Sequence, residues 1–83
     1  MSRWSVYILR CADGTLYTGI TTDIAARLAK HNSGDGAKYT RSRRPVELVW
    51  SRAMKSESAA RRGEVALKKL SKAEKEVFIS HAV

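Results

Sequence analysis

The sequence predicts an α+β domain, a small three-stranded antiparallel sheet flanked by helices in the order β-β-α-β-α-α. Three short segments are rich in β-branched and aromatic residues, which is typical of strands, and the other periodic segments repeat apolar residues at helical spacing. With 83 residues and one cysteine, the chain cannot build a disulfide framework. One small hydrophobic core must therefore hold residues 1–83 together as a single domain.

The first two strands are predicted over residues 4–10 and 15–20, joined at an Asp-Gly pair that favours a hairpin. Side chains alternate along a strand, so the loop length decides which of them share a face. A two-residue loop would place Tyr7 and Tyr17 on opposite faces. A three-residue Ala-Asp-Gly loop pairs Leu9 with Tyr17 and places both tyrosines on one face. We favour the longer loop because it makes chemical use of both phenols, although alternation alone leaves both open.

A first helix is predicted over residues 24–33. Thr22-Asp23 supplies a cap for its N-terminus, and Gly34 is the residue type that commonly ends a helix. Arg27 and His31 are four residues apart, so both side chains should lie along one edge of the apolar stripe of this helix.

A loop over 34–45, a third strand over 46–50 and two further helices complete the chain. The second helix is predicted from about 56 to 70, and a capping box over 71–74 begins the third. The third strand should present Val46, Leu48 and Trp50 on one face. The residues expected to face the core from the last two helices are Ala59, Gly63, Ala66, Leu67, Leu70, Val77, Phe78 and Ala82.

The charge balance indicates a polyanionic partner. Sixteen Lys and Arg residues against eight Asp and Glu give a formal net charge of +8, which favours phosphate binding, although a well-solvated basic protein is the simpler reading. The segment 38–44 is either a solvated turn or the lining of a nucleic-acid groove. Its basic residues, the candidate nucleic-acid contacts, are Lys38, Arg41, Arg43 and Arg44.

No membrane partner is expected. No apolar stretch approaches the roughly 20 residues that a membrane-spanning helix needs. The N-terminal residues lack a signal-peptide cleavage site, and a single cysteine suits a reducing compartment, so the cytoplasm is the expected location.

Glu64 is the most informative single residue. Its place beside the apolar stripe of the second helix suits either a metal ligand or an ordinary ion pair with Arg61 or Lys68. Gly63 costs a helix interior about 1 kcal/mol relative to alanine, which we interpret as close packing of this helix against the sheet.

Four other residues have both a chemical and a structural reading. Arg27 could clamp a phosphate with its planar guanidinium, or it could be a solvated residue at a helix edge. His31 could shuttle a proton, or it could simply interact favourably with the helix dipole. Tyr7 and Tyr17 could be catalytic phenols or ordinary sheet residues.

Together these residues resemble the GIY-YIG nuclease superfamily. VYI at 6–8 and YTG at 17–19 are similar to its two tripeptide motifs. Arg27, His31 and Glu64 match the family's helix arginine, the position four residues later, and the metal-binding glutamate. The run TGITTDIAARLAKHNSGDGAKYTRSRRP is especially similar to the small stand-alone bacterial branch.

The resemblance implies a metal-dependent endonuclease that hydrolyses DNA phosphodiester bonds with little sequence preference. Nicked, branched or single-stranded DNA in repair or recombination would be its substrate, with RNA also open. Glu64 would hold one Mg²⁺ or Mn²⁺ ion, and Arg27 would neutralise charge on the phosphoryl oxygens. Tyr17, in preference to Tyr7, would activate the attacking water, and His31 would contact the phosphate or relay the proton.

Two alternatives are kept. The high charge and the lack of a recognition domain in this sequence are compatible with a nucleic-acid-binding module that keeps the fold, cuts poorly and acts through a protein partner. A basic protein-interaction adaptor is the third reading. Binding to nucleic acid at about 0.15 M salt separates the adaptor from the other two.

Overall fold

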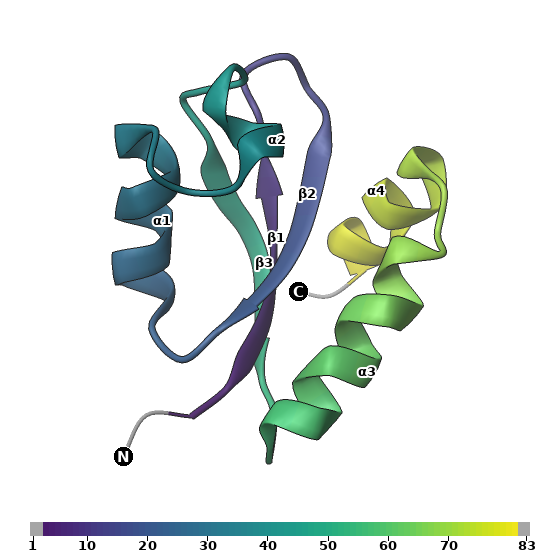
Figure 1. The fold of residues 1–83 in the computed structure, drawn as a ribbon. Coiled ribbons are helices and arrows are strands. Elements are labelled where there is room, and N and C mark those ends of the chain that lie inside the picture. The colour runs from purple at the N-terminus through teal and green to yellow at the C-terminus, as the bar shows by residue number, and fades with distance from the viewer. Residues whose placement is uncertain (1–2, 82–83) are drawn as a thin grey trace.

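The computed structural model describes residues 3–81 as a three-stranded antiparallel sheet with helices on both faces (Figure 1). The predicted order β-β-α-β-α-α is confirmed, with one additional short helix before the third strand. The elements are β1 (Ser5–Arg10), β2 (Leu16–Thr21), α1 (Ile24–Ser33), α2 (Lys38–Arg41), β3 (Glu47–Ala53), α3 (Glu57–Lys68) and α4 (Lys72–His81).

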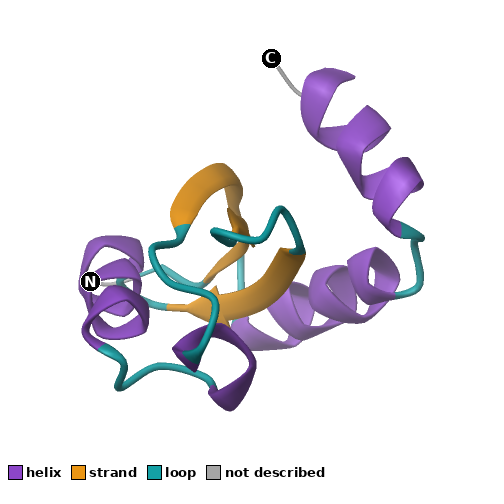
Figure 2. Ribbon diagram, turned by 90° about the horizontal axis from the view of Figure 1, so that it is seen from above, coloured by secondary structure: helices purple, strands orange, loops and turns teal. Residues whose placement is uncertain are grey.

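The central strand β1 has β2 on one side and β3 on the other. Helix α1 lies on one face of the sheet, and α3 and α4 lie on the opposite face (Figures 1 and 2). Alternation along β1 divides the core between the two faces. The α3 side contains Val6, Ile8, Leu16 and Leu67, and the α1 side contains Tyr7, Leu9, Cys11 and Val46.

The β1–β2 hairpin has the longer of the two loops that the sequence allowed. Leu9 lies opposite Tyr17, and the Cys11 amide donates to the Thr15 carbonyl at 2.8 Å, which leaves three residues in the loop. The last of these, Gly14, has a φ of 85°, a conformation that glycine adopts without steric penalty. Both tyrosines therefore lie on the face that α1 covers, as the favoured register predicts.

Strand β3 contains a bulge that the alternation rule did not predict. Ile8 pairs with Trp50 but Leu9 pairs with Leu48, so one residue between them is extra. This residue reverses the alternation. Val46 packs on the Tyr7 face, whereas Trp50 packs on the Ile8 face. The prediction that Val46, Leu48 and Trp50 share one face is therefore wrong, and the strand also extends beyond the predicted residue 50 to Ala53.

The segment 34–45 is not only a loop, because it contains the four-residue helix α2. A helix this short has no repeat of apolar positions, so periodicity could not reveal it. Its two central residues have opposite environments. Thr40 is completely buried, and Tyr39 is 40% exposed.

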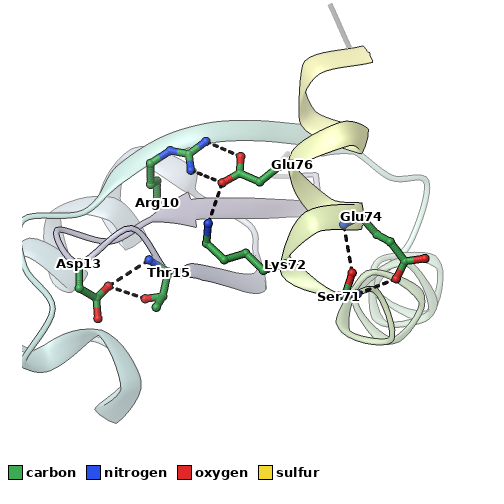
Figure 3. Close-up of polar contacts among 7 residues, drawn as sticks. All are labelled: Arg10, Asp13, Thr15, Ser71, Lys72, Glu74 and Glu76. Atoms are coloured by element: carbon green, nitrogen blue, oxygen red, sulfur yellow. Dashed lines mark hydrogen bonds and ion pairs between the residues drawn. The ribbon is translucent and has the colours of Figure 1, made fainter.

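Helix α4 begins at the predicted capping box. The Ser71 amide donates to the Glu74 carboxylate at 2.8 Å, and the Glu74 amide donates to the Ser71 hydroxyl at 3.1 Å (Figure 3). A bidentate ion pair between Arg10 and Glu76, with distances of 2.6 and 2.9 Å, connects α4 to β1 (Figure 3). Hydrogen bonds from Arg10 and from Lys72 lower the pKa of Glu76 to about 2, with the Arg10 bond contributing most.

Some predicted core positions of the last two helices are wrong. Ala66 and Val77 are exposed, whereas Ala60, which the helical pattern did not single out, is completely buried. Ala82 lies outside the described residues. A side-chain carbon at Gly63 would lie 3.7 Å from Val6 of β1, so α3 packs on the sheet there as expected, but the contact is an ordinary one that does not require glycine.

Among residues 3–81, no helix combines the length and the apolar character that crossing a membrane requires.

Candidate active site

The phenol of Tyr7 lies directly over the backbone of β2. Tyr7 pairs across the strands with Gly19, the last residue of the YTG motif. A carbon atom added to Gly19 would lie only 2.5 Å from the Tyr7 hydroxyl oxygen and 3.2 Å from the ring of Tyr17. Any larger residue would occupy the space of the phenol, so this glycine is required for the observed position of Tyr7.

His31 lies at the centre of the packed face, whereas the helical stripe suggested that it would lie at the edge. It is completely buried. Its Nε2 atom is 3.1 Å from the Tyr7 hydroxyl, and its Nδ1 atom is 2.8 Å from the Thr40 hydroxyl. Burial first, and then the positive charge of Arg27, lower the pKa of His31, so the imidazole is neutral near pH 7.

The Tyr7 phenol is also neutral near pH 7. Burial raises its pKa above the ordinary value of 10.0, and the neighbouring Arg27 guanidinium, which favours the phenolate, opposes this effect. The neighbouring Tyr17 and the negative charge of Glu64 raise the pKa further. Arg27 and Glu64 therefore both influence the Tyr7 phenol, in opposite directions.

Tyr17 completes an aromatic cluster around His31. Its ring centroid is 6.4 Å from that of Tyr7 and 5.2 Å from the imidazole. On its other side Tyr17 stacks on Tyr39 at 5.9 Å, and the Arg43 guanidinium lies 4.1 Å from the Tyr39 centroid. The position of Tyr17 is thus set by contacts on both sides of its ring.

Glu64 comes from α3, which covers the opposite face of the sheet. Helix α3 packs against β1 and the edge strand β2, so a side chain can reach around that edge towards the tyrosine face. The Glu64 side chain is 21% exposed and lies 3.3 Å from the Lys68 ammonium. The other candidate partner, Arg61, pairs instead with Glu57 at 2.6 Å. Glu64 thus forms the ordinary ion pair and also lies close enough to influence Tyr7.

The four basic residues of segment 38–44 divide into two groups. Lys38 and Arg41 are exposed, and neither belongs to a salt bridge within residues 3–81. The other two have internal partners. Arg43 pairs with Asp13 at 3.0 Å, and Arg44 donates to the Arg41 carbonyl at 2.8 Å. Lys38 and Arg41 are therefore the two that are free to contact a ligand.

The family assignment rests on sequence as well as geometry. The sequence profile of the GIY-YIG catalytic domain matches residues 3–77, nearly the whole chain. The chain belongs to the GIY-YIG family. Among its relatives, the UPF0213 protein DP2720 of Desulfotalea psychrophila is 54% identical over 77 residues, which cover 92% of this chain and 70% of that protein. The UPF0213 protein VNG_2274C of Halobacterium salinarum is 55% identical over 73 residues, covering 88% and 95%.

Solved structures have the same fold. The solution NMR structure of the UPF0213 protein BH0048 from Bacillus halodurans has a TM-score of 0.62 and 49% identity, covering 99% of this chain and 86% of that one. The solution NMR structure of EF2693 from E. faecalis has a TM-score of 0.64 and 43% identity, covering 96% and 84%. The α+β architecture of this GIY-YIG domain is therefore shared with experimentally determined relatives.

The acidic side chain that could help to hold a cation at this site is Glu64. Among the described residues no group of three or more His, Cys, Asp or Glu side chains could hold a metal ion. What the site offers is the partly exposed carboxylate of Glu64. Mg²⁺ commonly binds through one or two carboxylates, retains several waters and also takes substrate phosphates as ligands, so a single carboxylate is compatible with it.

Sequence reasoning missed Thr40 as a member of this site. Thr40 belongs to the basic segment, and nothing in its sequence context predicts a contact with a histidine nine positions earlier. The importance of Gly19 could have been found, because it is a motif letter opposite Tyr7 in the favoured register.

Proposed function

We propose that this GIY-YIG domain is a divalent-metal-dependent endonuclease that hydrolyses DNA phosphodiester bonds with low sequence specificity. The observation that carries the proposal is the environment of one phenol. The Tyr7 hydroxyl lies 3.1 Å from His31 Nε2, and its pKa is lowered by the nearby Arg27 and raised by the charge of Glu64. This environment, with a proton acceptor in contact and a cation and a carboxylate influencing the same phenol, supports the proposal.

The contacts favour Tyr7 over Tyr17 as the residue that activates water, a revision of the expectation from the sequence. As a water molecule attacks phosphorus, its proton passes to the Tyr7 oxygen, and the phenolic proton passes to His31 Nε2. A neutral His31 and a protonated Tyr7 are the forms that this transfer needs. Tyr17, which has aromatic contacts with Tyr7 and Tyr39, would orient the water or the phosphate.

Arg27 is the charged group next to the reacting phosphate in this scheme. Its guanidinium can neutralise charge that develops on the phosphoryl oxygens. A divalent cation held by Glu64, Mg²⁺ or Mn²⁺, would supply Lewis-acid stabilisation of the scissile phosphate and of the departing 3′ oxygen. The Lys68 ammonium must leave Glu64 when such a cation binds.

The substrate is expected to be recognised through its backbone. Lys38 and Arg41 are exposed on α2, the helix whose Tyr39 stacks on Tyr17. Contacts of basic residues with phosphates position DNA without reading its sequence. Binding should therefore weaken steeply as salt rises. Selectivity would come from the shape of nicked, branched or single-stranded DNA, as in repair or recombination, with any further targeting supplied by a protein partner.

The test is cleavage of supercoiled plasmid and of nicked and branched oligonucleotides by purified protein in Mg²⁺ or Mn²⁺. Glu64→Gln should lower the rate by about 100-fold or more, because it removes the charge that holds the cation. Glu57→Gln is the matched control, since it alters another paired carboxylate on α3 and should leave cleavage unchanged. Equal activity of wild type and a folded Glu64→Gln variant would refute the proposal.

The Glu64–Lys68 ion pair favours a second candidate function. In a nucleic-acid-binding module that does not cut, this pair would simply stabilise α3. Salt-sensitive binding of DNA or RNA without cleavage of any substrate in any metal would support this candidate and contradict the first.

A further inference from the structure

Thr40 connects the buried side of His31 to the backbone. Its hydroxyl oxygen is 2.8 Å from His31 Nδ1 and 3.0 Å from the Ala37 carbonyl oxygen. A threonine hydroxyl has one proton to donate, and a carbonyl oxygen can only accept. If the proton goes to Ala37, the Thr40 oxygen is left to accept a hydrogen bond, and His31 Nδ1 must carry the hydrogen.

The opposite side of the imidazole leads to the same assignment. Tyr7 is almost completely buried, and a guanidinium such as that of the nearby Arg27 has no atom that could accept the phenolic proton. The phenolic proton therefore needs an acceptor, and the hydrogen-bond partner found for it within residues 3–81 is His31 Nε2. An Nε2 atom that accepts has no hydrogen of its own, so a neutral imidazole has its hydrogen on Nδ1.

We infer that Thr40 is a positioning residue that holds His31 as the Nδ1–H tautomer, with the Nε2 lone pair directed at the Tyr7 hydroxyl. Because each ring nitrogen's hydrogen bond sets the state of the other, an acceptor at Nδ1 is sufficient for this. The resulting chain of donors runs from Tyr7 through His31 and Thr40 to the Ala37 carbonyl.

The neighbouring backbone leaves little room for a water molecule to take the place of the Thr40 hydroxyl. A carbon atom added to Gly36 would lie 2.5 Å from His31 Nδ1 and 2.8 Å from its Cα, so segment 36–40 closes tightly over this side of the ring. Thr40 itself is completely buried. Removal of its hydroxyl should leave Nδ1 without a partner.

The tautomer assignment is independent of the proposed nuclease activity. The consequence of this tautomer for catalysis, however, rests on the proposed function. Only the Nδ1–H tautomer can accept the proton of Tyr7. The opposite tautomer would present an N–H group to the phenol and block the proposed transfer.

The decisive measurement is the tautomer of His31, read from the ¹⁵N chemical shifts of both ring nitrogens in protein labelled at histidine. In wild type, Nδ1 should have the shift of a protonated nitrogen and Nε2 that of an unprotonated one. Thr40→Ser keeps the hydroxyl and should preserve this pattern. Thr40→Val keeps the shape without the hydroxyl and should shift the population towards Nε2–H. His81, exposed on α4, is the internal reference and should be unchanged in every variant.

Cleavage provides the second readout. Thr40→Val should lose about 100-fold or more in rate, and Thr40→Ser should retain most of it. A wild-type His31 with its hydrogen on Nε2 overturns the inference, and so does a folded Thr40→Val variant with an unchanged tautomer. The measurement on wild type does not depend on whether any variant folds. If wild type has the expected tautomer but cuts no substrate, the proposed function fails and the assignment stands.

Discussion

Replacement of Gly19 by alanine tests whether the position of Tyr7 depends on a missing side chain. The added carbon would lie 2.5 Å from the Tyr7 hydroxyl oxygen and 2.7 Å from the ring carbon that bears it. Ordinary contact begins near 3.4 Å. The phenol must therefore move by about 0.9 Å, a displacement large enough to break its hydrogen bond to His31.

The expected effect on stability follows from these two changes. Overpacking of a buried site costs about 1–3 kcal/mol, and loss of the hydrogen bond to His31 adds about 1 kcal/mol. Reduced freedom of the unfolded chain offsets about 0.4–1 kcal/mol of this. The free energy of unfolding should thus fall by about 1–4 kcal/mol. Cleavage should fall more, because a misplacement of about 1 Å at a reacting group can lower the rate 100-fold.

Gly63→Ala is the matched control, because it adds the same carbon in a helix with ordinary contacts of 3.6 Å and longer. It should raise the free energy of unfolding by up to about 1 kcal/mol and leave cleavage unchanged. Urea unfolding followed by tryptophan fluorescence gives the free energy of unfolding of each variant. If Gly19→Ala were as stable and as active as wild type, the contact between Tyr7 and the β2 backbone would not have the assigned role.

Three further predictions concern other parts of the molecule. The Thr18 hydroxyl is buried without a hydrogen-bond partner among the described residues. Thr18→Val should therefore raise the free energy of unfolding by about 1 kcal/mol in urea titrations. Destabilisation would mean that the hydroxyl is hydrogen-bonded. The pKa of Glu76 falls from 4.5 to about 2, so the stabilisation from its pair with Arg10 is present above pH 4.5 and is lost as the pH falls towards 2. Glu76→Gln should therefore lower Tm at pH 7 and have little effect at pH 2, whereas an equal loss at both would contradict the ion pair's role. Lys68→Met should reduce the Mg²⁺ concentration that gives half-maximal cleavage at saturating DNA, because it removes the ammonium that competes for Glu64; a higher requirement would argue against a cation there.

Much of the fold could be predicted because its signals are local. The cap at Asp23, the left-handed Gly34 after α1 and the capping box of α4 depend on residues within four positions of one another. The hairpin loop was narrowed to two alternatives by strand alternation, and the structure has the favoured one. The bulge in β3 was not predictable from alternation, because one extra residue reverses the faces without leaving a local signal.

The candidate site was predictable only as a set of residues. Motif order and helical spacing brought Tyr7, Tyr17, Arg27, His31 and Glu64 together as candidates. The contacts between these residues could not be deduced from the sequence pattern. The choice of Tyr17 as the water-activating residue had no contact behind it, whereas the hydrogen bond of Tyr7 to a buried histidine favours Tyr7 in our proposal.

The sequence alone therefore determined the strands, most of the helices and the family motifs, since periodicity and caps act over a few residues. Tertiary structure alone decided that His31 is buried between a phenol 24 positions before it and a hydroxyl nine positions after it. Such contacts depend on how separate elements pack. A buried polar group needs a partner, but its own sequence neighbourhood does not specify which residue will supply it.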